Sequence, residues 1–281
     1  MAKFLLGLLT ASGIAYMAYR VRALNRSGAI TAALLGTIVF GLGGVEWALL
    51  MLIFFISSSA LSKFFEGKKI TLGMNFSKGS RRDAWQVMAN GGMAGLMALS
   101  YFILSKFSPE SHFFPYLWIE FGASLAGANA DTWGTELGLL NAKDPFLIST
   151  FSRVPKGTSG GVSLVGTLAS LGGSALVGSA AWLIAIVGRG HGQDLHPLIQ
   201  FLVITGSGLF GALVDSFLGA TLQSIYYCPV CKKETEQHPL HRCGSPTLHQ
   251  RGLKWLNNDW VNAACTVSAG CFGFLLAILL S

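Results

Sequence analysis

Eight apolar segments, separated by short polar stretches, run along this chain. They cover residues 4–20, 28–44, 46–62, 85–105, 113–129, 161–187, 198–223 and 259–280. A membrane-spanning helix needs about 20 mostly apolar residues, and each segment approaches that length. The pattern therefore predicts an all-α, polytopic transmembrane helix bundle of about eight spans, forming a single membrane domain over residues 1–281.

Composition supports a membrane protein. Only 12% of the residues are charged, against about 25% in an average soluble domain. The mean hydropathy is +0.53, and the 35 glycines suit helices that approach closely in lipid. The first segment lacks a clear small-x-small cleavage site and is followed, not preceded, by basic residues, so we expect a retained span rather than a signal peptide.

Basic residues are distributed unevenly between the predicted loops. Loops 20–28, 63–84, 130–160 and 224–258 carry nearly all of them, whereas the rest of the chain holds only Lys3, Lys106 and Arg189. Cytoplasmic loops carry the excess of Lys and Arg. We therefore expect this first set of loops in the cytoplasm and both termini outside, and we read the net charge of +7 as topology rather than nucleic-acid binding.

Acidic residues collect at the ends of spans on the predicted cytoplasmic side. Asp131 and Glu136 lie in "AGANADTWGTELG", Asp215 interrupts the seventh segment and Asp259 opens the eighth. Ionisable groups within spans usually face a cavity, and oxygen ligands suit Mg²⁺. These four are candidate catalytic residues, with Asp131 and Glu136 as magnesium ligands; the plain alternative is solvated acids at an interface.

The five-residue spacing of Asp131 and Glu136 does not place them on one helix face. We expect a bend, or an extended Asp131 with Glu136 opening a short helix, to bring both to one cation. Asp259 and Asn262 are three residues apart and can share a face. Glu120, deeper in the fifth segment, is either a pocket residue or paired within the bundle.

A glycine-rich stretch, "RVPKGTSGGVS", precedes the sixth segment. Backbone N–H groups at a helix start form an anion site, so the stretch is a candidate phosphate-binding loop, although it can equally be a tight start of a helix. It is not a Walker A sequence, because its lysine precedes the glycines. The candidate phosphate and nucleotide contacts from this and neighbouring stretches are Arg81, Arg82, Asp83, Asn90, Asn129, Arg153, Lys156, Thr158, Ser159, Gly160, Gly161, Asn258 and Asn262. The arginines among them can instead be topology anchors.

A cysteine-rich loop, residues 224–256, lies between the last two spans and reads "CPVCKKETEQHPLHRCG" at its centre. Cys228 and Cys231 form a CxxC pair, and His241 and Cys243 form a second pair. Structural zinc takes four N or S ligands in sets such as Cys3His, so we expect these four to bind Zn²⁺, with His238 as an alternative to His241. A disulfide or a redox pair remains an alternative, although a cytoplasmic location disfavours a stable disulfide.

The stretches "ANADTWGTELG", "PKGTSGGVS", "RRDAWQVMANGG", "CPVC…HRCG" and "RGLKWLNNDWVN" resemble, over nearly the whole chain, the integral membrane family of the plant and cyanobacterial phytyl-phosphate kinases and a related animal transmembrane protein. More loosely, an acid followed by Pro155 to Gly161 is similar to CTP-dependent polyprenol kinases and phosphatidate cytidylyltransferases. The chain lacks the acid before the glycine pair that the cytidylyltransferases have, which weakens that likeness.

The resemblance implies phosphoryl transfer from a nucleoside triphosphate, with CTP favoured over ATP, to an isoprenyl monophosphate such as phytyl or geranylgeranyl phosphate. With the acids described above, we expect Mg²⁺ as cofactor, the lipid bilayer as the acceptor's environment and a possible homo-oligomer. Two other classes stay open, a transporter or scramblase of anionic isoprenoids or phospholipids and a cytidylyltransferase that forms a CDP-lipid.

Overall fold

The computed structural model describes residues 2–71, 81–188 and 195–281, and these residues form eight helices, one π-helical turn and five short strands. The helices are α1 (Ala2–Arg20), α2 (Arg26–Ile38), α3 (Val45–Thr71), α4 (Ala84–Phe107), α5 (Phe114–Gly138), α6 (Leu164–Ile186), α7 (Pro197–Thr221) and α8 (Asn258–Leu280), with the π-helical turn η1 (Val39–Gly43) after α2. Each helix covers one of the predicted apolar segments, so the predicted helical membrane fold is confirmed.

Within the described residues, six helical segments are long and apolar enough to cross a membrane: α2 with η1, α3, α4, α6, α7 and α8. The helices α1 and α5 are not among the six. In α5, Glu120, Asn129 and Asp131 interrupt the apolar sequence, because this helix is surrounded by protein and its polar side chains are shielded from lipid.

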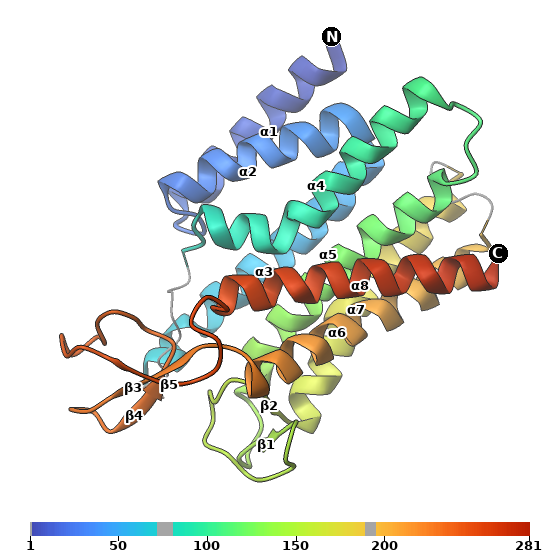
Figure 1. The fold of residues 1–281 in the computed structure, drawn as a ribbon. Helices are drawn as coiled ribbons and strands as arrows, with labels where there is room; N and C mark the ends of the chain where they lie inside the picture. The colour runs from blue at the N-terminus through green and yellow to red at the C-terminus, as the bar shows by residue number, and fades with distance from the viewer. Residues whose placement is uncertain (1, 72–80, 189–194) are drawn as a thin grey trace.

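Helix α5 is the centre of the bundle. It contacts α3, α4, α6, α7 and α8, and every side chain from Trp118 to Ala130 is buried. Its small residues allow this packing: a Cβ on Gly127 would lie 2.8 Å from the Cβ of Ala269 in α8. In Figure 1 the helices α5 to α8 form one group, α2 lies beside α4, and α1 packs against α2 at the edge of the bundle.

The turn between α1 and α2 is joined to the start of α4. Leu24 and Arg82 form a parallel bridge, the backbone N–H of Asn25 donates to the carbonyl of Arg82 at 3.0 Å, and the N–H of Arg82 donates to the carbonyl of Ala23 at 3.0 Å. These bonds bring two loops that are distant in sequence to the same end of the bundle.

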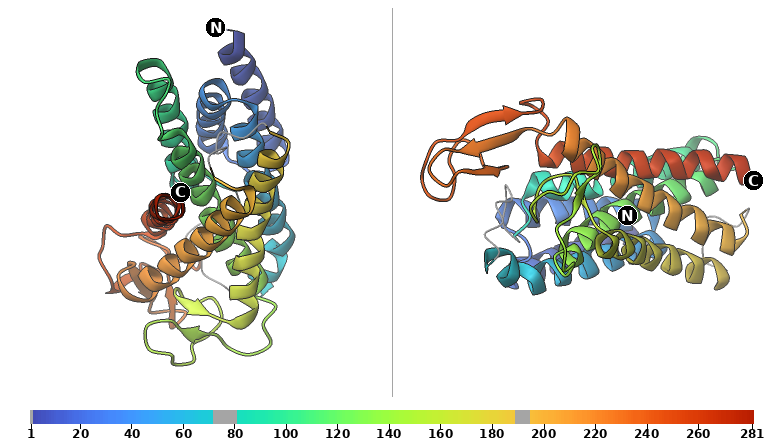
Figure 2. Two further views of the ribbon diagram at one scale, coloured as in Figure 1. Left: turned by 90° about the vertical axis from the view of Figure 1, so that its right-hand side faces the viewer. Right: turned by 90° about the horizontal axis from the view of Figure 1, so that it is seen from below.

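The same end holds two small sheets (Figures 1 and 2). Strand β1 (Phe146–Leu147) pairs antiparallel with β2 (Gly161–Val162), and β3 (Ile225–Cys228) lies between β4 (Lys233–Thr235) and β5 (Leu248–Arg251) in the cysteine-rich loop. Both chain termini lie away from these sheets (Figure 1). The described parts of the predicted basic loops thus share one end. Lys78 of loop 63–84 lies outside the described residues, as do Arg189 and His191 of the loop before α7.

We predict that positions 3 and 254 are on opposite sides of the membrane, because the basic loops should face the cytoplasm. A cysteine introduced at Lys3 should react with a membrane-impermeant maleimide from outside intact cells. A cysteine introduced at the exposed Lys254 should react only after permeabilisation. The parent chain measures the background from its five native cysteines, and labelling of both positions from the same side would contradict the predicted topology.

Candidate functional site

A polar pocket of about 460 Å³ lies at the end of the bundle that carries the two sheets. Helices α3, α4, α5, α6, α7 and α8 contribute to its walls together with the loop 139–163 and the cysteine-rich loop. The predicted site residues that line it are Arg82, Asn90, Asp131, Glu136, Lys156, Thr158, Ser159, Gly160, Gly161, Asp215, Asn258 and Asn262.

The two acids of α5 reach this pocket from an unbroken helix. The helix continues to Gly138, so the expected bend or extended segment at Asp131 is wrong. With 3.6 residues per turn, Asp131 and Glu136 point about 140° apart. Both line the pocket because it wraps around the end of the helix, and Thr132, Gly134 and Thr135 line it as well.

Asp215 faces Asp131 from α7. The two carboxyl groups are close enough to form a side-chain hydrogen bond, and Glu236 also acts on Asp215 electrostatically. Oδ2 of Asp215 is buried and makes no hydrogen bond within the part of the chain that the structure describes. Two adjacent carboxylates repel unless a proton or a cation lies between them, so the donor set fits a divalent cation with oxygen ligands.

Arg82 supplies a buried positive charge to the same pocket. Its side chain is nine-tenths buried, its Nη1 donates to Ser58 Oγ at 3.1 Å, and its guanidinium lies 5.8 Å from the ring centroid of Phe54. Burial lowers the pKa of Arg82 to about 10, and the negative charges of Glu136 and Asp131 oppose this shift. Arg82 is therefore a cation at neutral pH, held beside the acids.

The glycine-rich stretch forms the loop of the β1–β2 hairpin against the end of α7. Gly160 has a φ of 82°, and a Cβ there would collide with the backbone of Ala220, so this position requires glycine. Lys156 Nζ donates to the carbonyl of Asn141 at 2.5 Å. Helix α6 begins at Leu164 rather than at 161, because β2 intervenes and the side chain of Ser163 caps the helix by accepting from the N–H of Gly166.

Helix α8 contributes amides rather than its acid. Asn258 and Asn262 line the pocket, whereas Asp259 does not. Residues four apart share a helix face. Asp259 lies in the first turn of α8 with its Oδ1 buried, and a carboxylate there interacts favourably with the helix dipole. The expectation that Asp259 and Asn262 face one pocket is met by Asn262 alone, and the role of Asp259 stays a prediction.

Other predicted residues also lie outside the pocket lining, and local contacts account for three of them. Asn129 bridges α3 and α6, accepting from Ser57 Oγ at 2.9 Å and donating to the carbonyl of Gly173 at 2.8 Å.

Asp83 caps α4 by accepting from the N–H of Gln86. Arg153 is exposed over the ring of Phe146, 4.9 Å from its centroid, and Arg81 is exposed at the surface.

The cysteine-rich loop adds residues that the sequence pattern did not single out. Glu236 and Arg242 line the pocket from this loop. Ser159 Oγ donates to Gln223 Oε1 at 2.7 Å, and Gln223 Nε2 donates to Glu236 Oε1 at 2.9 Å. The glycine-rich loop is thus tied through Gln223 to the cysteine-rich loop. The only sequence signal for Glu236 and Arg242 was their position among the predicted zinc ligands.

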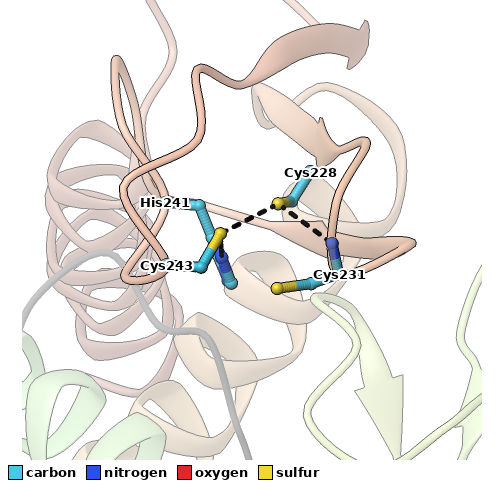
Figure 3. Close-up of side chains that lie close together, drawn as sticks. All are labelled: Cys228, Cys231, His241 and Cys243. Atoms are coloured by element: carbon cyan, nitrogen blue, oxygen red, sulfur yellow. Dashed lines mark hydrogen bonds between the residues drawn. The ribbon is translucent and has the colours of Figure 1, made fainter.

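Cys228, Cys231, His241 and Cys243 form one cluster (Figure 3), with ligand atoms within 4.8 Å of one another. The Sγ atoms of Cys228 and Cys243 are 3.6 Å apart, and His241 Nδ1 is 3.2 Å from Cys243 Sγ. Tetrahedral zinc with Zn–S bonds of about 2.3 Å places sulfur ligands about 3.8 Å apart. The cluster can therefore hold a metal such as zinc.

The geometry favours His241 over His238 as the fourth ligand. His238 instead stacks on Tyr226 at 4.3 Å between ring centroids and lies 3.3 Å from Thr247 Oγ1. Cys265 is buried and Cys271 exposed on α8, and neither belongs to the cluster.

We predict that the purified protein contains about one zinc per chain, because a Cys3His set provides all four ligands of a closed structural site. Elemental analysis of the wild type and of Cys231→Ser should show loss of most of the zinc in the variant. Cys271→Ser is the matched control and should keep it. A metal-free wild type with a Cys228–Cys231 disulfide under reducing conditions would contradict the prediction.

The chain is similar to proteins of a plant and of microorganisms. It is 34% identical over 270 residues to Protein PGR of Arabidopsis thaliana, covering 92% of this chain and 91% of that protein. It is 28% identical over 243 residues to Protein VTE6, chloroplastic, of the same plant, covering 86% and 62%. It is 28% identical over 263 residues to an uncharacterized membrane protein of Methanocaldococcus jannaschii, covering 94% and 90%.

No solved structure matches the chain. The family model described as integral membrane protein DUF92 matches residues 9–270, which is nearly the whole chain. The family resemblance expected from the sequence motifs is confirmed, and the chain belongs to the integral membrane protein family DUF92.

Proposed function

We propose that this protein is a nucleoside triphosphate-dependent kinase that phosphorylates an isoprenyl monophosphate to the diphosphate at the cytoplasmic membrane face. The observation that carries the proposal is the polar pocket, in which the carboxylates of Asp131, Glu136 and Asp215 face Arg82 and the glycine-rich loop. The resemblance to the phytyl-phosphate kinases and the similarity to the chloroplastic protein VTE6 support this class of substrate.

In the proposed reaction, an oxygen of the acceptor's phosphate attacks the γ-phosphorus of the nucleotide. The bond from that phosphorus to the bridging oxygen breaks, and the nucleoside diphosphate leaves. Such a transfer needs mainly positioning and charge neutralisation. An acceptor that is already a phosphate anion at neutral pH needs no strong general base.

The acids would hold the magnesium ion that accompanies the nucleotide. Asp131 and Asp215 lie within hydrogen-bonding distance of each other in the pocket wall, and the buried Oδ2 of Asp215 makes no hydrogen bond within the described residues. Mg²⁺ is usually held by one or two carboxylates together with substrate phosphates, and it supplies neutralisation of charge on the transferred group.

Different basic and hydroxyl side chains of the pocket would bind the phosphates of the nucleotide and the phosphate of the acceptor. Lys156, Thr158 and Ser159 lie together on the hairpin loop and suit the nucleotide's phosphates. Arg82 lies across the pocket on the α3–α4 side, where a guanidinium fork can bind a second phosphate in a bidentate manner. Arg242, from the cysteine-rich loop, adds a third positive charge at the pocket wall.

One observation favours an enzyme over a carrier. Outside the polar pocket, two polar side chains of the central helix make hydrogen bonds inside the bundle: Asn129, which bonds Ser57 and Gly173, and Trp118, which donates to Gln200 at 3.3 Å. A carrier needs a polar path across the membrane, whereas the polar pocket here is confined to one end.

Turnover with identified products is the direct test. We predict that purified protein with CTP or ATP, Mg²⁺ and phytyl or geranylgeranyl phosphate yields the prenyl diphosphate and a nucleoside diphosphate, both measurable by mass spectrometry. Omission of Mg²⁺ is the control and should abolish the product. A CDP-lipid with release of pyrophosphate would instead indicate a cytidylyltransferase, and absence of any turnover would indicate a transporter.

We predict that Asp131→Asn lowers turnover by about 10²-fold or more, the typical loss on removing one electrostatic contact to the transition state. Glu136→Gln and Asp215→Asn should also impair turnover, and the defects should lessen at high Mg²⁺ if these acids recruit the metal. Glu110→Gln, an exposed acid in the loop before α5, is the matched control and should be near normal.

Thermal stability of the same variants separates chemistry from folding. Asp131 and Asp215 carry adjacent carboxyl groups, which repel when both are charged, so removing one of these two charges should not lower the melting temperature. Near-normal turnover of Asp131→Asn and Glu136→Gln at low Mg²⁺ would refute the metal site, and misfolding of all three pocket variants would show that the acids are structural.

A further inference from the structure

A second cavity, of about 320 Å³, lies between the first four helices and is almost entirely apolar. We call it the apolar cleft. Residues of α1, α2, η1, α3 and α4 line it, among them Ile14, Leu35, Phe40, Met51 and Phe55. Apart from Arg82, which precedes α4, the proposed reaction assigns this part of the bundle no role, since the nucleotide loop and all three acids belong to α5–α7 and the β1–β2 hairpin.

The apolar cleft and the polar pocket meet at three side chains. Arg82, Gln86 and Asn90 line both cavities. Each of the three carries polar groups suited to phosphate oxygens, and Arg82 carries the positive charge. The apolar cleft thus ends at a buried cation on the wall of the proposed phosphoryl-transfer site.

The dimensions and openness of the apolar cleft suit one apolar chain. It follows α3 from Val45 to Phe55, about 15 Å at 1.5 Å per residue. At its far end Val45 and Leu49 are 53% and 46% exposed, so the apolar cleft reaches the surface of the bundle that faces lipid. A chain can therefore enter sideways from the bilayer while its headgroup stays beside Arg82.

We infer that the apolar cleft is the acceptor subsite, which binds the tail of a single-chain isoprenyl phosphate and places its phosphate at Arg82, Gln86 and Asn90. The inference rests on the proposed function only for the chemistry of the headgroup. Charge complementarity selects an anionic headgroup, and the narrow contact between α2 and α4 selects one chain. There Leu35 packs so tightly that a Cβ on Gly91 would lie 2.7 Å from its Cδ2.

The position of Ala48 offers a test of tail length. Ala48 lines the apolar cleft on α3, one helical turn from Val45 and far along α3 from Phe54, which contacts Arg82. Ala48→Phe should fill the distal part of the apolar cleft and leave the headgroup end unchanged. Ala60→Phe is the matched control, because Ala60 is exposed on the same helix and lines neither cavity.

Binding without nucleotide is measured by native mass spectrometry or thermal shift of the full-length protein in detergent. We expect Ala48→Phe to weaken binding of geranylgeranyl phosphate by about tenfold, equivalent to losing about two buried methylene groups. Binding of dimethylallyl phosphate should be unchanged, and Ala60→Phe should bind both as the wild type does. Arg82→Gln should weaken both ligands, whereas geranylgeraniol, which lacks the phosphate, should bind Arg82→Gln and the wild type alike.

The outcomes distinguish this inference from the proposed function. Chain-length-selective loss of binding without any turnover supports the acceptor subsite and refutes the kinase. Normal turnover in which Ala48→Phe treats long and short acceptors alike refutes the subsite and keeps the kinase. Displacement of geranylgeranyl phosphate by a modest excess of two-chain phosphatidic acid would overturn the inference in favour of a site for bulk bilayer lipid.

Discussion

The main physical constraint on this structure is the cost of placing carboxylates at the end of a helix that is buried inside a membrane bundle. Helix α5 is buried from Trp118 to Ala130 and then presents Asp131 and Glu136. Charged groups at such a depth are costly unless water, cations or basic side chains solvate them. The polar pocket meets this need, because the helix ends, the hairpin loop and Arg82 surround the acids and exclude lipid from them.

Much of the helical architecture could be predicted from the sequence, because lipid imposes a simple rule on length and apolarity. The end of α5 could not, since "NADTWGTELG" is too polar to be read as part of a span and becomes helical through packing. A Cβ on Gly134 would collide with Ser170 of α6, which shows how closely α6 covers this last turn. The start of α6 was also misplaced, because the two-residue strand β2 has no periodicity to read.

The candidate site could be predicted in part for a similar reason. Acids in apolar surroundings are conspicuous in a sequence, so Asp131, Glu136 and Asp215 could be selected as pocket residues. Whether Asp259 lines the pocket depends on the rotation of α8 about its axis, which the sequence does not give. Glu236 and Arg242 were missed because an exposed-looking charged loop reveals nothing of what it folds against. Their placement depends on the chain of hydrogen bonds from Ser159 through Gln223 to Glu236, which only the tertiary structure shows.

Arg82 connects the two halves of the molecule. Its backbone pairs with the α1–α2 turn, its side chain bonds Ser58 of α3, and its charge interacts with Glu136 and Asp131 of α5. An unpaired buried guanidinium would destabilise the fold. Negative charge from nearby acids, or from a bound phosphate, offsets this cost. Under the proposed function, the same residue joins the apolar helices, which would hold the lipid tail, to the acids, which would hold a metal and phosphates. A substrate with an apolar chain and an anionic head satisfies both sides of this junction at once, which neither a free nucleotide nor an uncharged lipid does.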